Sequence, residues 1–510
     1  MTEREKDLRA RAAAAEKRRE EVAAGKYRCR YHLMPPVGWM NDPNGLSKIR
    51  GRYYVFFQYA PESADGRGMH GWGLYTSPDL LVWTYEGMKI YPDAPFDEDG
   101  AYSGSVVPDG KGFRLYYTGN VKYKDKAYDY ISDGRESNTV LIRSEDGIAL
   151  GKKQVLLRTE DYPAEFTRHI RDPKVNRTEK GYEMFLGGRL KRDKGAVLRY
   201  QSADGEIFSL EGVLTTEKPF GYMWECPDFF RLDGRDYLCV SPQGVAHEQY
   251  RYQNRYASGY FENDVSENNF REWDFGFDFY APQTFWDGTR RILYGWIGMP
   301  DAPYDNLPSV AEGWQGALTM PRVLTAGKRG LLQNPAPELE SLRGRELSAE
   351  EESDSFELLL QSIAPGTRVE LCGALSLSFG EREVVLRFFS PAGRGREVRR
   401  AATAAKCARI FLDVSVCEIY LNDGEAVLTT RLYPECYTLR IDGDCLCRRY
   451  EMLPLHYREK ETEAGSTTKS DGQSKNRDKT DRKRNKTEVP RDKYRENSFA
   501  EKEGGKDYDF

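Results

Sequence analysis

No run of about eighteen apolar residues occurs in the 510-residue sequence, and a membrane-spanning helix needs roughly that length. We therefore expect neither a transmembrane helix nor a membrane partner. The sequence also lacks an excess of basic residues, because its net charge is -5 and its pI is about 5.9. This balance argues against a nucleic-acid partner. The first 26 residues are dense in Arg, Lys and Glu and lack the apolar core of a signal peptide.

Cysteine occurs nine times, but without a recognisable pairing pattern. Cys445 and Cys447 are separated by a single residue, which is not the CxxC spacing of a zinc site. An odd number of cysteines without a pattern favours reduced thiols. We therefore predict a cytoplasmic protein.

The length of the chain predicts two or more domains. Residues 1–26 favour one charged, exposed helix with little apolar face. Between residues 27 and 335, short aromatic and aliphatic runs alternate with Gly, Asp, Asn and Pro. These runs are residues 53–57, 113–117, 182–186, 237–240 and 291–296. Short runs of this kind, bounded by turn residues, predict an all-β domain.

A repeated turn motif within this domain favours a propeller. Residues 76–79, 143–147 and 201–205 each contain Ser-x-Asp, and each follows a strand-like run. They recur at roughly sixty-residue intervals, and about 300 residues at that spacing would hold five blades. The alternative is that Ser-x-Asp marks hairpin turns in any β protein. We predict a five-bladed β-propeller over residues 27–335.

The remainder of the chain divides into a linker, a second domain and a tail. Residues 335–344 are predicted to form the linker. Residues 345–455 contain short alternating strands and a hairpin turn at Asn422-Asp423-Gly424, which together predict a β-sandwich. Residues 456–510 are polar, with very few large apolar side chains, and are predicted to be disordered.

The stretch Trp39-Met40-Asn41-Asp42-Pro43-Asn44-Gly45 is the most informative part of the sequence. Pro43 favours extended or turn geometry before it, and Gly45 permits a tight turn. The Asp42 carboxylate would thus lie beside side-chain amides and an indole. Such surroundings suit the binding of a polar ligand such as a sugar. The alternative is an Asx-turn in which Asp42 only satisfies backbone donors.

Two further acidic motifs follow in the same domain. Arg171-Asp172-Pro173 presents a charged pair in extended backbone, although such a pair is often structural. Glu225 lies between Trp224 and Cys226. Partial desolvation by these neighbours favours a protonated carboxyl, which suits a proton donor, although a buried and satisfied acid would have the same surroundings.

Together the three motifs resemble, in order and approximate spacing, the signatures of glycoside hydrolase family 32. That family contains invertases, levanases and related β-fructosidases. The resemblance extends from about Tyr31 to Pro434. Other segments that resemble the family are residues 56–59, 102–105, 280–285, 295–296, 317–322 and 422–425.

The resemblance implies a five-bladed propeller with a C-terminal β-sandwich, and a retaining double displacement. Asp42 would be the nucleophile, Glu225 the general acid and then base, and Asp172 the transition-state stabiliser. The resemblance implies that neither a metal nor a cofactor is needed. The implied substrate-binding residues are Trp39, Met40, Asn41, Gln58, Trp72, Tyr102, Ser103, Arg171 and Trp296.

One segment departs from the family pattern. The family usually has His-Trp-Gly-His, whereas this chain has Met69-His70-Gly71-Trp72-Gly73-Leu74, with an extra Gly before the Trp and no second His. The assignment of Trp72 to the pocket wall is therefore weaker than that of the acids. His70 is predicted to be a structural loop residue.

Within the family, residues 32–36, 241–244 and 298–304 resemble bacterial intracellular sucrose or sucrose-6-phosphate hydrolases. The predicted function is hydrolysis of one of these small sugars, with the oligomeric state unassigned. The alternatives are a fructan exohydrolase or fructosyltransferase with the same acids, and a non-catalytic carbohydrate-binding protein on the same fold.

Overall fold

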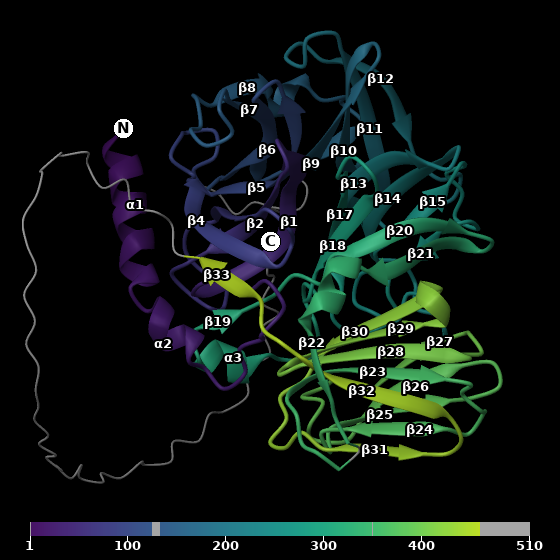
Figure 1. Ribbon diagram of the computed structural model, residues 1–510. Coiled ribbons are helices and arrows are strands. Elements are labelled where there is room, and N and C mark those ends of the chain that lie inside the picture. Colours follow the sequence, from purple (N-terminus) through teal and green to yellow (C-terminus); the bar gives the residue numbers. More distant parts are fainter. Residues whose placement is uncertain (1, 125–132, 349, 459–510) are drawn as a thin grey trace, which may run out of the picture. The chain divides into compact units, whose positions relative to one another are not determined.

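The computed structural model describes residues 2–124, 133–348 and 350–458 (Figure 1). Within these residues the chain forms seven β-sheets and a few helices, which confirms the predicted all-β class. The helices are α1 (Glu3–Glu16), α2 (Arg19–Ala23), α3 (Leu307–Ala311), and the 3-10 helices η1 (Thr159–Asp161), η2 (Pro337–Leu342) and η3 (Asn422–Gly424). No helix in this described part is long and apolar enough to cross a membrane.

The described residues up to Pro335 form five mainly antiparallel sheets that follow one another along the chain. The first contains β1 (Gly38–Ile49), β2 (Arg52–Ala60), β3 (Gly71–Ser77) and β4 (Val82–Ile90); the second, β5 (Gly100–Asp109), β6 (Gly112–Lys122), β7 (Arg135–Ser144) and β8 (Gln154–Leu157). The third contains β9 (Phe166–Thr178), β10 (Gly181–Leu190), β11 (Lys194–Ser202) and β12 (Ser209–Leu214); the fourth, β13 (Met223–Leu232), β14 (Arg235–Gln243), β15 (Gly259–Glu262) and β16 (Arg271–Glu272). The fifth contains β17 (Tyr280–Trp286), β18 (Arg291–Trp296), β20 (Arg322–Gly327) and β21 (Gly330–Pro335).

The first strands of these sheets touch one another in sequence order. β1 contacts β5, β5 contacts β9, β9 contacts β13, β13 contacts β17, and β17 returns to contact β1. The five first strands therefore bring together side chains that are up to nearly 250 residues apart in the sequence. A segment of that length is about the size of one domain.

The five runs predicted as strands are confirmed, and each lies in the second strand of its sheet. These strands are buried along most of their length. Strands covered on both faces appear in a sequence as continuous apolar runs, which is why these strands were predictable.

The repeated Ser-x-Asp motif marks the same turn in three sheets, after β3, β7 and β11. In the second copy, Asp146 Oδ1 accepts hydrogen bonds from the backbone of Ile148 and Ala149, both at 2.8 Å. Asp79 and Asp204 accept the corresponding bonds in the other two copies. The sequence repeat therefore reflects a structural repeat.

The N-terminal segment differs from the single exposed helix that was predicted. It forms α1 and α2, and α1 lies against the protein through Arg4, Leu8, Ala12 and Glu16, which are spaced four residues apart on one face. Leu8 and Ala12 are buried, Arg4 donates to two backbone carbonyls, and Glu16 accepts from the hydroxyls of two tyrosines. Polar contacts therefore hold α1 against the rest of the protein as much as apolar contacts do. The prediction considered only the apolar face of the helix and so missed these contacts.

After Pro335 the chain forms two further sheets. One contains β22 (Arg343–Glu346), β32 (Leu446–Met452), β23 (Ser355–Gln361), β28 (Cys407–Asp413), β29 (Val416–Leu421) and β30 (Ala426–Arg431); the other, β27 (Val398–Ala401), β26 (Val384–Phe388), β25 (Leu375–Phe379), β24 (Arg368–Leu371) and β31 (Leu439–Asp442). Their apolar side chains form one buried cluster. The predicted hairpin turn is confirmed as η3, between β29 and β30.

Two predicted connecting regions contain more structure than expected. The linker contains η2, whose Leu339 and Leu342 are buried. The predicted tail begins with β33 (His456–Arg458), which pairs in parallel with β4, while β19 (Trp314–Gln315) pairs with β1. Both edges of the first sheet are thereby covered, which protects them from pairing with other chains. The rest of the predicted tail lies outside the described residues.

Candidate active site

The three predicted acids lie on the first strands of three different sheets, each at a β-bulge. The register of β1 shifts at Asp42, that of β9 at Asp172, and that of β13 directly after Glu225. Asp172 has φ of 65° and Cys226 has φ of 47°, in the left-handed region that non-glycine residues seldom adopt. Bulges re-aim side chains, and strained backbone of this kind is concentrated at functional sites.

Asp42 is held by hydroxyl and amide donors. Ser103 donates from Oγ to Asp42 Oδ2 at 2.6 Å, and Asn41 donates from Nδ2 to Oδ1 at 3.1 Å. Trp39 donates from Nε1 to Asn41 Oδ1 at 2.8 Å and thereby orients that amide. Burial raises the pKa of Asp42, although the bonds from Ser103 and Asn41 oppose the rise.

Asp172 is buried, and its position is set through its backbone. Its N–H donates to Thr118 Oγ1 at 2.9 Å, and its Oδ2 accepts from the backbone N–H of Cys226 at 2.9 Å. Burial raises the pKa of Asp172 to about 7; Arg171 opposes the rise, and the charges of Glu225 and Asp42 add to it. Asp172 therefore changes its charge close to neutral pH.

Glu225 accepts hydrogen bonds at both carboxyl oxygens. Arg171 contacts Oε1 at 2.5 Å, while Gln243 and Tyr280 donate to Oε2 at 2.8 and 2.5 Å. These three partners come from β9, β14 and β17, so that three sheets fix one carboxyl group. Sequence reasoning included Arg171 but missed Gln243 and Tyr280, whose only signal was that each lies in a segment resembling the family.

Cys226 joins the other two acids. Its thiol lies 3.7 Å from Asp42 Oδ2 and 3.6 Å from Asp172 Oδ2. Because Cys226 follows Glu225 directly in β13, this single residue brings all three acids into one cluster. The sequence analysis treated Cys226 only as an apolar neighbour.

The predicted substrate-binding residues separate into two groups. Asn41, Ser103 and Arg171 contact the acids directly, as described above. Trp39 and Trp296 are buried and pack edge to face, with ring centroids 5.5 Å apart. These side chains form one continuous cluster around Asp42 and Glu225.

The second group is buried, and among the described residues its members form no hydrogen bond with the three acids. Met40 is fully buried in a hydrophobic cluster, and Tyr102 is buried on β5. Trp72 is also fully buried and donates from Nε1 to backbone carbonyls of β5 at 3.1 and 3.2 Å. Gln58 donates to the Ala101 carbonyl of the same strand at 3.0 Å. The side chains of Trp72 and Gln58 thus hold the strand that carries Ser103.

His70 lies in the segment that departs from the family pattern. Its carbonyl accepts from the backbone N–H of Ala101, at 3.0 Å. Burial lowers the pKa of its imidazole to about 4, so the ring is neutral at physiological pH. The backbone contact fits the predicted structural role.

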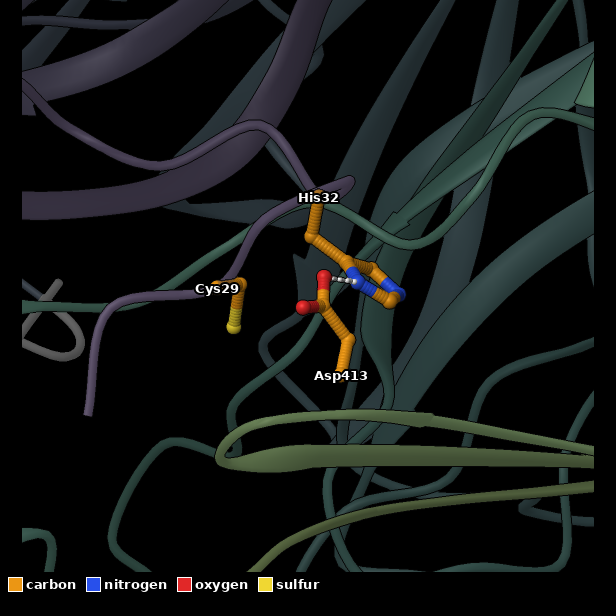
Figure 2. A group of neighbouring side chains, drawn as sticks. All are labelled: Cys29, His32 and Asp413. Atoms are coloured by element: carbon orange, nitrogen blue, oxygen red, sulfur yellow. Dashed lines mark hydrogen bonds and ion pairs between the residues drawn. The ribbon is translucent and has the colours of Figure 1, made fainter. Parts of the chain in front are cut away.

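Cys29, His32 and Asp413 form a group of potential metal ligands within the described part of the chain (Figure 2). The Asp413 carboxylate already accepts from two backbone N–H groups and from His32 Nδ1, the last at 2.7 Å. His32 Nε2 lies 2.9 Å from Glu418. Burial opposes protonation, but the bonds to Asp413 and Glu418 outweigh it and raise the pKa of His32 to about 9.

A protonated imidazole cannot ligate a metal, so these residues fit an ion cluster better than a metal site. Glu418 also binds Arg322 of β20 at 2.7 Å, and Arg322 contacts Asp274 at 3.2 Å. The His32 cluster therefore links the N-terminal segment, the fifth sheet and the β28–β30 sheet through buried charges.

Comparisons with known proteins agree with this geometry. Residues 32–335 match the glycosyl hydrolases family 32 N-terminal domain, and residues 406–443 match the family 32 C-terminal domain. The chain is 37% identical over 465 residues to the sucrose-6-phosphate hydrolase of Bacillus subtilis, covering 85% of this chain and 95% of that protein. It is also 37% identical over 440 residues to a raffinose invertase of Escherichia coli, covering 79% and 89%.

Among solved structures, sucrose-6-phosphate hydrolase from Lactobacillus gasseri superposes with a TM-score of 0.78 at 26% identity, covering 87% of this chain and 97% of that one. Fold, acid cluster and sequence therefore define the class as a glycoside hydrolase. The chain belongs to glycosyl hydrolase family 32.

Proposed function

We propose that the chain is a retaining β-fructofuranosidase that releases the terminal β-D-fructofuranosyl unit of sucrose or sucrose-6-phosphate. The observation that carries the proposal is the shared contact of Asp42 and Asp172 with Cys226, next to Glu225. Three carboxyl groups from three sheets, held by polar donors in a buried cluster, supply the parts of a double displacement.

In this proposal Asp42 attacks the anomeric C2 of the fructosyl unit. Ser103 and Asn41 each bind one of its carboxylate oxygens, which favours the ionised form that a nucleophile needs. The bond from C2 to the leaving oxygen breaks as the bond to Asp42 forms. A fructosyl ester of Asp42 is the intermediate.

Glu225 gives a proton to the leaving oxygen and later takes one from water as the water attacks C2. Tyr280 and Gln243 donate hydrogen bonds to its Oε2 and orient the carboxyl group, and Arg171 forms an ion pair with its Oε1. Asp172 remains beside the fructosyl ring and stabilises the positive charge that develops there.

We also propose that residues 27–335 form a five-bladed propeller that carries this site, and that residues 345–455 form a β-sandwich domain. The closed circuit of contacts through the first strands of the five sheets supports the propeller. The nine cysteines are all free, which supports a reducing compartment such as the cytoplasm.

Kinetics of Asp42→Ala and Glu225→Ala with sucrose and sucrose-6-phosphate test these roles. Each substitution is expected to lower kcat by a factor of about 1,000 or more while leaving the unfolding midpoint nearly unchanged. Asp109→Ala, which removes a partly exposed acid at the far end of β5, is the matched control. Activity retained by either variant would refute the role assigned to that acid.

The substrate class is tested separately with inulin and levan. The proposal predicts much faster turnover of the disaccharides. Rapid fructose release from either polymer, with poor cleavage of both disaccharides, would replace the proposal with a fructan exohydrolase. Transfer of fructose to sucrose as the main reaction would indicate a fructosyltransferase.

A further inference from the structure

Helix α1 contacts both of the loops that lead into β3 and β5. Arg11 donates from Nε and Nη2 to the two carboxylate oxygens of Glu62, both at 2.8 Å, in the loop between β2 and β3. Arg4 donates to the carbonyls of Pro92 and Glu98, at 3.0 and 2.8 Å, in the loop between β4 and β5. The two arginines lie two turns apart on one side of the helix, so a single rigid element holds both loops.

Glu62 connects the helix to the far end of its own loop. Its Oε2, which pairs with Arg11, also accepts from the backbone N–H of Met69 at 2.9 Å. Between these residues Gly66 and Gly68 have φ of 76° and 104°. Glycines make a loop costly to order, because they give the free chain many conformations. The pair of Arg11 and Glu62 therefore fixes a loop whose own sequence does little to fix it.

Both loops meet at the start of the strand that carries Ser103. The carbonyl of His70, at the end of the first loop, accepts from the backbone N–H of Ala101 at 3.0 Å. Glu98, in the second loop, lies two residues before the start of β5. Ser103 follows on β5 and donates to Asp42 Oδ2 at 2.6 Å. A chain of hydrogen bonds therefore runs from α1 to the nucleophile.

The last turn of α1 holds a neighbouring strand in the same way. Glu16 Oε1 accepts from the hydroxyls of Tyr59 and Tyr85, at 3.2 and 2.6 Å. Tyr59 follows Gln58 on β2, and the Gln58 amide donates to Ser103 Oγ at 3.4 Å. The contacts of α1 thus converge on Ser103 from two directions, along β5 and from β2.

We propose that α1 is a positioning element for the nucleophile, which fixes the start of β5 through Arg4 and Arg11 and thereby holds Ser103 on Asp42. Within the described residues both arginines bind loop atoms and not the three acids, so they are positioning residues. A small misplacement of a reacting group lowers the rate of the chemical step strongly. This inference rests on the proposed β-fructofuranosidase activity. It gives a role to the N-terminal helix and to residues 69–74, which depart from the family pattern.

The test measures sucrose hydrolysis by the double variant Arg4→Gln/Arg11→Gln. Each Gln keeps a long polar side chain and removes the charge and the forked donors. The variant is expected to lower kcat at least about fivefold and to change KM less than about twofold. Lys6→Gln removes an exposed ion pair with Glu3 within the same helix, so it is the matched control and should leave both values unchanged.

A double-mutant cycle with Ser103→Ala separates positioning from a purely structural role. If α1 acts through Ser103, the two arginine substitutions should lower kcat less than about twofold in the Ser103→Ala background. A helix that only stabilises the fold would lower kcat by the same factor in both backgrounds. Unfolding midpoints measured on all variants show that the rates belong to folded enzyme.

The outcomes separate this inference from the proposed function. An unchanged kcat in the double variant, or an equal loss with and without Ser103, would overturn the role of α1 and leave the hydrolase intact. A wild-type enzyme that cleaves neither sucrose nor sucrose-6-phosphate would overturn the proposed function instead. If the double variant does not fold, the single variants decide the matter, because Arg4 and Arg11 both reach the surface. Each should then lower kcat about twofold, and only while Ser103 is present.

Discussion

The buried ion cluster around His32 allows a quantitative prediction for the substitution His32→Gln. The imidazole lies 2.7 Å from Asp413 and 2.9 Å from Glu418, and all three side chains are 0% exposed. Gln can keep a hydrogen bond but carries no charge. The substitution therefore leaves two buried carboxylates without the positive charge between them, which costs about 3–5 kcal/mol when one partner of a buried pair is removed.

The pH dependence follows from the pKa of His32, which rises from 6.5 in the unfolded chain to about 9 in the folded protein. A rise of this size corresponds to about 3 kcal/mol of stabilisation by the bound proton. Because the folded pKa is the higher one, this contribution is fully present below pH 6.5, decreases as the pH rises, and is absent well above pH 9. The wild-type protein should lose it over that window, whereas His32→Gln should not.

Urea unfolding at several pH values between 6 and 10 measures this effect. The difference in free energy of unfolding between wild type and His32→Gln should be largest at pH 6 and smaller by about 3 kcal/mol at pH 10. His456→Gln, which removes an exposed imidazole on β33, controls for the loss of a histidine. A difference that stays constant across the range would refute a charged His32 in the cluster.

Two further predictions concern the acid cluster. Tyr280→Phe removes one donor to Glu225 and should lower kcat about tenfold with little change in KM, while Tyr237→Phe, whose hydroxyl has no partner among the described residues, should change neither. An effect on KM alone would contradict an orienting role for Tyr280. The pKa of Asp172 is raised to about 7, and only its ionised carboxylate stabilises the positive charge on the fructosyl ring, so kcat/KM should rise as the pH rises through that value. A profile that stays flat between about pH 5 and pH 9 would contradict this role of the Asp172 carboxylate.

The sequence was most informative where local chemistry and structure coincide. The second strands of the five sheets are continuous apolar runs, and the three acids lie in short motifs whose Pro and Gly residues impose the bulge geometry. The first strands were harder to predict, because they carry polar residues and their bulges interrupt the alternation that identifies a strand.

The same bulges explain why one predicted substrate-binding residue, Met40, lies in the hydrophobic core. Met40 is two residues from Asp42, and simple alternation would put both on one face. The register shift at Asp42 separates them and leaves Met40 in the core. Tyr280 and Gln243 could not be assigned from local sequence, because their contact with Glu225 depends on how three sheets meet.

The account's central claim is a double displacement through Asp42, and the anomeric configuration of the first product tests it most directly. Proton NMR during the first moments of sucrose hydrolysis, before the free sugar mutarotates, identifies the fructose as it leaves the enzyme. Two displacements at C2 predict β-fructofuranose as the initial product. Initial release of α-fructofuranose would show a single displacement by water and would contradict the assignment of Asp42 as the nucleophile.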